Sequence, residues 1–215
     1  MFSEGAGVRL SMPQALLLAL HVRDAAGLVP PVSDLLPDLP PLAPPAAPLV
    51  GASAELAGAR VAGEQWARWW AGAFPGGPQA LTSILPPRYP GLRGMPELRG
   101  FVELDADEAV AWCARARQVE ADVLRRVPTA LFETNLLGEV ERELGRRLRT
   151  FRLDVVVLPV AGAHAWEVAG VPVISLALRA DRGAYLAWLR ERLLAIGRLR
   201  GGSGVSGSDG GRTGV

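Results

Sequence analysis

Residues 155–178 read VVVLPVAGAHAWEVAGVPVISLAL, two apolar runs that enclose a short loop. The residues leading into the first run alternate between apolar and polar, and both runs are rich in β-branched side chains, which predicts two covered strands. The loop over 161–170 has about ten residues, fewer than the dozen or more that a parallel crossover usually needs. We therefore expect the two strands to pair as an antiparallel hairpin.

Helical patterns flank these strands on both sides. Apolar residues recur at helical spacing from Asp105, where acidic side chains suit a capping box, as far as Pro128. A second helix is predicted over 129–148, and a third begins after Asp181, which can cap it. The predicted fold class is α+β: a helix-flanked antiparallel β-hairpin or small sheet over residues 99–199.

The first fifty residues are predicted to form a helical and proline-rich arm on that core. Ser11 can cap a short amphipathic helix that has Pro13 in its first turn and ends near Gly27. The proline-rich stretch that follows blocks long helices and strands, so it should be an extended, semi-rigid connector. Its leucines are too many for a solvated linker, so it either lies on its own domain or binds a partner.

The next segment combines a tryptophan-rich helix with a loop over 75–100 that is rich in Pro and Gly. Trp66, Trp69 and Trp70 cover a broad helix face, which suits burial against a core or a partner. The Gly- and Ser-rich tail has too little apolar content to fold and is predicted to be disordered. The predicted divisions of the chain are 1–50, 51–98, 99–199 and 200–215.

Composition limits the chemistry and the partners. All 23 basic residues are Arg, a usage typical of GC-rich genomes, so we expect a high-GC bacterium and no lysine chemistry. The net charge of +1 lacks the basic excess that nucleic-acid binding normally needs. Cys113 is the only cysteine, which excludes an intrachain disulfide and multi-cysteine metal sites and favours a cytoplasmic location.

Neither a membrane anchor nor a secretory signal is expected near the N-terminus. The apolar stretch Met12–Leu20 is about nine residues long, whereas a membrane-spanning helix needs about 20. A secretory signal would also require a basic start, and here Glu4 offsets Arg9. We read this stretch as a folded or docking helix.

The loop between the strands holds a histidine and a carboxylate, which together can move protons or bind a metal. His164 and Glu167 are fewer than the three or four ligands that zinc needs, so no metal is predicted. A pocket between this loop and the 75–100 loop is nevertheless our first alternative, in a small enzyme or small-molecule binder. Its candidate ligand residues are Arg88, Tyr89, His164 and Glu167.

Two clusters of charge have simple structural explanations. The acids at the start of the predicted helix could bind magnesium, but they also stabilise the helix dipole; they are Glu103, Asp105, Asp107 and Glu108. Arginines before the first strand give a second alternative, an adaptor for nucleic acid, although interleaved glutamates favour a solvated, ion-paired helix. These arginines are Arg142, Arg146, Arg147, Arg149 and Arg152.

We expect a non-catalytic protein that binds or assembles other proteins. No enzyme motif occurs in the chain, which lowers the expectation of catalysis without excluding it. Several apolar side chains lie in segments that cannot form a core of their own, and these are the predicted partner contacts: Val32, Leu35, Leu36, Leu39, Trp66, Trp69 and Trp70. The expected partner is another protein or a second copy of the chain, and no cofactor is predicted.

Overall fold

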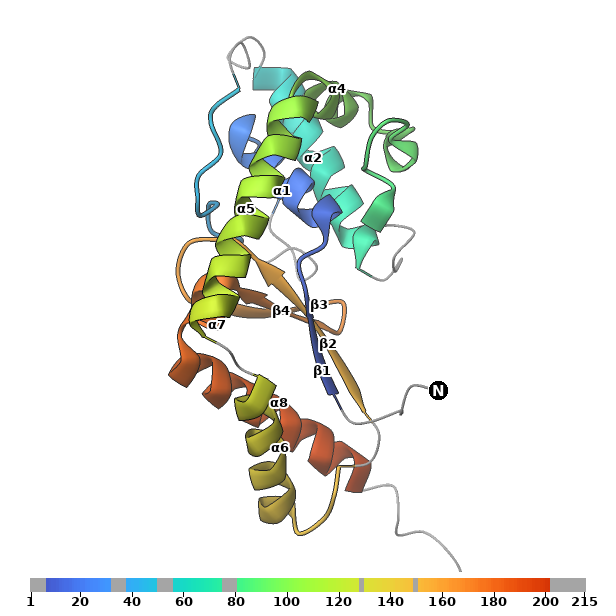
Figure 1. The fold of residues 1–215 in the computed structure, drawn as a ribbon. Coiled ribbons are helices and arrows are strands. Elements are labelled where there is room, and N and C mark those ends of the chain that lie inside the picture. The colour runs from blue at the N-terminus through green and yellow to red at the C-terminus, as the bar shows by residue number, and fades with distance from the viewer. Residues whose placement is uncertain are drawn as a thin grey trace, which may run out of the picture.

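The computed structural model describes residues 7–31, 38–49, 56–74, 81–127, 130–148 and 151–201. Within these ranges the fold is α+β, with seven α-helices and one open four-stranded sheet (Figure 1). The strands are β1 (Gly7–Ser11), β2 (Arg152–Leu158), β3 (Ala165–Val168) and β4 (Val171–Ser175). The helices are α1 (Gln14–Ala25), α2 (Leu56–Ala73), α4 (Pro96–Leu104), α5 (Ala106–Arg126), α6 (Ala130–Leu144), α7 (Leu176–Ala180) and α8 (Arg182–Gly201).

The sheet is mixed, with strand order β1-β2-β4-β3. β1 and β4 both run parallel to β2, and only β3 is antiparallel to its neighbour β4. The expected antiparallel pairing of the two apolar runs is therefore wrong, because β2 and β4 pair in parallel. The second run is also shorter than predicted, since Ser175 caps α7 and the apolar residues after it are helical.

The connection between β2 and β4 explains this difference. It forms a strand of its own, β3, which runs back beside β4 and turns through Ala169 and Gly170. Both turn residues have positive φ, 49° and 77°, as the tight hairpin turns that match the strand twist require. The connection between the parallel strands β2 and β4 thus contains one short strand, β3. Parallel strands are usually connected by a helix, which needs more residues.

The N-terminal residues belong to the sheet and its core. β1, which the sequence did not indicate, pairs in parallel with β2 from Gly7 opposite Arg152 to Ser11 opposite Val156. α1 follows after Pro13 and is buried on nearly every side, so it is not the amphipathic helix that we expected. The division of the chain at residue 50 stays a prediction, but residues 7–25 pair and pack with elements of the 99–199 segment.

α2 packs on α1, and α4 packs on α2, at one end of the sheet (Figure 1). The indoles of Trp66 and Trp70 stack with their centroids 4.9 Å apart, and the Trp66 indole N–H donates to the Ala19 carbonyl at 2.7 Å. α4 begins inside the predicted 75–100 loop, because Pro96 is tolerated in the first turn of a helix, where its missing N–H has no intrahelical partner.

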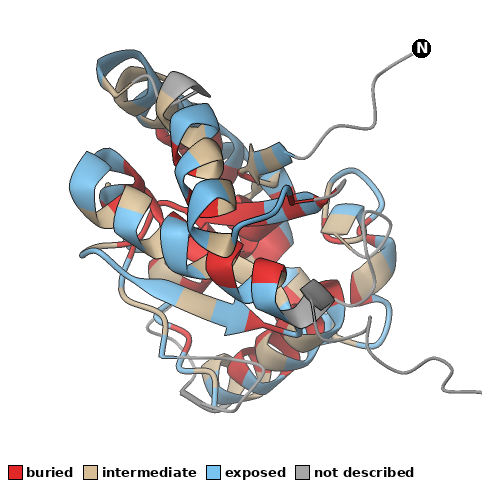
Figure 2. Ribbon diagram, turned by 90° about the horizontal axis from the view of Figure 1, so that it is seen from below, coloured by how far each residue is buried: buried red, intermediate tan, exposed pale blue. Residues whose placement is uncertain are grey.

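The helices predicted around the strands are present. α5 and α6 match the two predicted helices, and Asp181 Oδ1 accepts the Ala184 N–H at the start of α8 at 3.0 Å. α6 and α8 lie beyond the other end of the sheet, and the buried residues line the strands and the inner helix faces (Figures 1 and 2). In the described ranges, no helix has both the length and the apolarity needed to cross a membrane.

Candidate protein-binding site

The predicted partner contacts divide into two groups. Val32, Leu35 and Leu36 lie outside the described residues, and Leu39 is half-buried against the core. The three tryptophans are buried: Trp66 and Trp70 are 0% exposed and Trp69 is 5% exposed. Their side chains therefore contact this chain itself, which is the core-packing role that their spacing allows.

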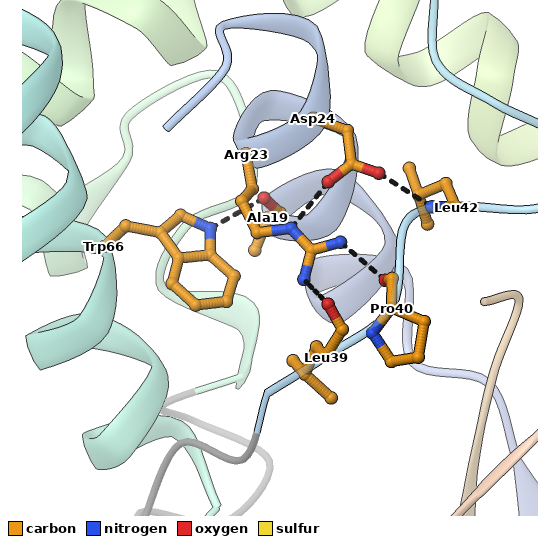
Figure 3. Close-up of polar contacts among 7 residues, drawn as sticks. All are labelled: Ala19, Arg23, Asp24, Leu39, Pro40, Leu42 and Trp66. Atoms are coloured by element: carbon orange, nitrogen blue, oxygen red, sulfur yellow. Dashed lines mark hydrogen bonds and ion pairs between the residues drawn. The ribbon is translucent and has the colours of Figure 1, made fainter. Parts of the chain in front are cut away.

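The second half of the proline-rich stretch is held by two charged residues of α1 (Figure 3). The buried Arg23 donates to the carbonyl oxygens of Leu39 at 3.2 Å and Pro40 at 2.9 Å. Asp24 accepts from Arg23 Nε at 2.6 Å and from the Leu42 N–H at 2.7 Å. Proline has no backbone N–H, so the proline-rich segment has few backbone donors of its own. The Arg23 guanidinium instead donates to the carbonyl oxygens of this segment.

Further hydrogen bonds bring the same segment onto the end of the sheet and onto α5. The Ala43 N–H donates to the Pro159 carbonyl and the Ala161 N–H to the Pro41 carbonyl, each at 2.8 Å. The Trp112 indole N–H donates to the Pro44 carbonyl at 3.2 Å. Residues 38–49 thus contact their own chain from several sides, which leaves fewer of their polar groups for a partner.

The four residues of the alternative ligand site form two separate pairs. Arg88 is exposed and Tyr89 is buried near α4, whereas His164 stacks on Trp166 and Glu167 pairs with Arg192 at 2.8 Å. Within the described residues, no hydrogen bond, ion pair or ring contact joins one pair to the other. The two cavities described for this chain are lined by other residues.

The predicted charge clusters are dispersed by local pairing. Glu103 pairs with Arg99 at 2.7 Å and Glu108 with Arg115 at 2.6 Å, while Asp105 points into the core. No group of three possible metal-binding side chains occurs in the described part of the chain. Of the five arginines, Arg152 pairs with Asp154, Arg146 donates to the Gly197 carbonyl, and Arg149 lies outside the described residues.

A buried histidine–aspartate contact joins α1 to the start of α5, and no sequence motif indicated it. His21 Nε2 lies 2.8 Å from Asp105 Oδ2, and the imidazole is tilted against the Trp112 indole. The two atoms are close but not aligned as a hydrogen bond, and His21 Nδ1 has no hydrogen-bond partner among the described residues. Burial lowers the pKa of His21 and raises the pKa of Asp105, while each group partly opposes the shift of the other.

We expect His21 to make the folded chain less stable in mild acid. Because burial lowers its pKa, the unfolded chain takes up a proton near pH 6.5 while the folded chain does not, so stability is lost as the pH falls. Between about pH 7 and pH 5, the unfolding free energy of the wild type should fall relative to that of His21→Gln, by at most about 1.4 kcal/mol per pH unit. Urea unfolding at a series of pH values measures this.

His164→Gln is the matched control for that series, because it removes the other histidine of the chain, whose ring is exposed. Asp105, Glu108 and Arg115 are present in both variants, and His21→Gln additionally removes the interaction that opposes the raised pKa of Asp105. The control should keep the slope of the wild type, and a His21→Gln variant with that same slope would contradict the assignment.

A surface groove of about 450 Å³ lies between α6 and α8. Its walls come from one face of each helix: Phe132, Asn135, Leu136, Glu139, Arg182, Leu186, Ala187 and Arg190. The two helices run in the same direction, since Tyr185 donates to Glu133 at 2.7 Å near their starts and Gly197 lies against Leu144 near their ends. At Gly197 a Cβ would come within 2.4 Å of Leu144 Cδ1, so any larger residue there would require the Leu144 side chain to shift.

The groove has an apolar middle and charged ends. The Arg182 guanidinium lies 3.3 Å above the Phe132 ring at one end, and Arg190 pairs with Glu143 toward the other. Glu139 is exposed on the rim. In the described part of the chain neither Arg182 nor Glu139 forms an ion pair, so the groove presents one cation and one carboxylate without a partner of opposite charge.

These observations define an α+β protein with a polar-rimmed groove between two parallel helices. No family model, curated protein or solved structure matches the chain.

Proposed function

We propose that the chain is a non-catalytic protein that binds another protein through the α6–α8 groove. The observation that carries the proposal is the composition of the groove, which has apolar side chains in the middle and, at the rim, Arg182 and Glu139, which have no ion-pair partner among the described residues. Protein interfaces commonly have this arrangement, a desolvated centre within a polar rim. The proposed binding surface is not the set of tryptophans and leucines that the sequence suggested. The tryptophan side chains are buried in the core.

The structure around the groove supports its use as a rigid docking surface. Tyr185 and Arg179 are almost completely buried behind it, and both approach Glu133 of α6, at 2.7 Å and 3.9 Å. The Arg179 guanidinium also lies 4.4 Å from the centre of the Tyr185 ring. This buried cluster ties α6 to α7 and α8, so a partner would meet walls that are already in place, which lowers the entropic cost of binding.

Photo-cross-linking from single positions tests the proposal. A photoreactive amino acid replaces Ala187, which is exposed in the groove, and in a matched control it replaces Ala114, which is exposed on α5. Both chains are irradiated in lysate of the source cells, and the adducts are identified by mass spectrometry. We expect a protein adduct of defined mass from position 187 and none from position 114.

Adducts that form equally from both positions would show nonspecific contact and would contradict the proposal. The absence of any protein adduct from position 187 would contradict it as well.

A further inference from the structure

We infer that the partner that fits the α6–α8 groove is a second copy of this chain, packed through the same groove about a two-fold axis. This inference rests on the proposed function and names its partner. In a two-fold interface the same patch is used twice, so each residue that contacts a second residue is in turn contacted by it. A patch suits this arrangement when it is complementary to itself, and the charges of this groove meet that condition.

The unpaired charges lie at different levels along the groove. The Arg182 guanidinium stacks on the Phe132 ring at the end of the groove nearest the start of α6. Glu139 lies seven residues after Phe132 on the same helix. At 1.5 Å per residue, the two charges are therefore separated by about 10 Å along the helix direction. A two-fold axis perpendicular to the helices and midway between these levels would bring each Arg182 opposite the Glu139 of the other copy.

The residues at that midpoint can accept close contact. Asn135 and Leu136 lie halfway along the groove on α6, and Leu186 and Ala187 lie halfway along it on α8. Each would meet its own symmetry mate or a near neighbour, and none of them carries a charge. Ala187 is small and exposed, so the helix backbones can approach each other there.

Burial of these residues would assemble α6 and α8 of both copies into a bundle of four helices, a common way of covering apolar helix faces. The remaining charges of the rim do not oppose this packing. Arg190 is already neutralised by Glu143 of its own chain, and Arg182 covers the Phe132 ring with its guanidinium plane. The dimer would thus contain two new ion pairs, and the Arg190 that lies at the level of each pair is already neutralised by Glu143 of its own chain.

Charge reversal followed by charge exchange tests the inference on the full chain. Sedimentation equilibrium gives the dimer dissociation constant of the wild type, of Arg182→Glu, of Glu139→Arg, and of the variant that carries both changes. Each single reversal would convert two attractive contacts into two repulsive ones, so we expect the dissociation constant to rise at least about tenfold. The double variant restores both attractions, and its dissociation constant should return to within about threefold of the wild type.

Two controls separate this result from misfolding. Glu139→Arg leaves the contact between Arg182 and Phe132 intact, and circular dichroism reports whether each variant keeps its helices. A variant with Arg60→Glu and Glu64→Arg exchanges the charges of an exposed ion pair on α2, away from the groove. It is the matched control for the double variant and should leave the dimer dissociation constant unchanged.

A wild-type chain that stays monomeric overturns the inference, and so does a dimer that the single reversals do not weaken or that the double variant does not restore. If the chain is monomeric but position 187 cross-links to a different protein, the proposed function stands and the partner inferred here is wrong. If position 187 cross-links to no protein, both fail.

Discussion

Replacement of Trp66 by alanine is expected to lower the free energy of unfolding by about 3–5 kcal/mol, the usual cost of deleting a large aromatic side chain from a core. Trp66 is 0% exposed, stacks on Trp70, and donates its indole N–H to the Ala19 carbonyl. The substitution would leave a cavity between α2 and α1 and would remove the indole hydrogen bond to the Ala19 carbonyl. Guanidinium unfolding followed by circular dichroism measures the loss.

Two further variants show which part of the side chain matters. Trp66→Phe keeps an aromatic ring but removes the hydrogen bond to Ala19, which should cost about 1–3 kcal/mol. Trp166→Ala changes a half-buried tryptophan of β3 and should cost less than about 1.5 kcal/mol. Equal losses from Trp66→Ala and Trp166→Ala would contradict the core role of Trp66, and α2 would again become a candidate partner surface.

Replacement of Arg23 by alanine is expected to lower the free energy of unfolding by about 3 kcal/mol, because a buried charged network loses its cation. The carbonyls of Leu39 and Pro40 would lose their donors, and the carboxylate of Asp24 would lose its neighbouring cation. The same variant should detach residues 38–49 from α1. Chemical unfolding gives the stability, and the rate of limited proteolysis at this segment reports the detachment.

Arg23→Lys keeps the positive charge but cannot reproduce the planar donor geometry, so it should recover only part of the loss. Arg152→Ala is the matched control, since it removes an arginine from an exposed ion pair with Asp154 and should cost less than about 1 kcal/mol. If Arg23→Ala is as mild as this control and proteolysis is unchanged, α1 does not hold the proline-rich segment as described.

α5 and α8 could be predicted because their signals are local. The periodic apolar residues of α5 begin after Asp105 and end before Pro128, and the structure places the helix over Ala106–Arg126. Asp181 likewise marks the start of α8 through its own capping bond. In both elements the residues that decide the boundary lie within one turn of it.

The sheet could not be predicted in the same way, because its pairing depends on distant segments. β1 is five residues long and its partner among the described strands, β2, begins at Arg152, so no nearby pattern indicated it. The parallel pairing of β2 with β4 depends on β3, which the loop-length argument had counted as loop. The contact between His21 and Asp105 likewise joins helices that are far apart in sequence.

The candidate site could not be predicted either, because it also forms between segments that are distant in sequence. Arg182 and Glu139 each look like an ordinary exposed charge on its own helix, and only the parallel packing of α6 against α8 brings them to one groove. The tryptophans, by contrast, were correctly described as covering a broad helix face, but sequence could not decide between a core and a partner. Trp66 is enclosed by α1, an element predicted as part of a separate arm.

We propose that the chain binds through the α6–α8 groove and not through the proline-rich segment or α2. Hydrogen–deuterium exchange of the full chain, compared between dilute and concentrated solutions, decides between these surfaces because it maps contact along the whole backbone. We predict slower exchange at high concentration in peptides that cover 132–139 and 182–190, with no change over 38–49 or in α2. Protection of residues 38–49 or α2 instead, or no protection anywhere, would contradict binding through the groove.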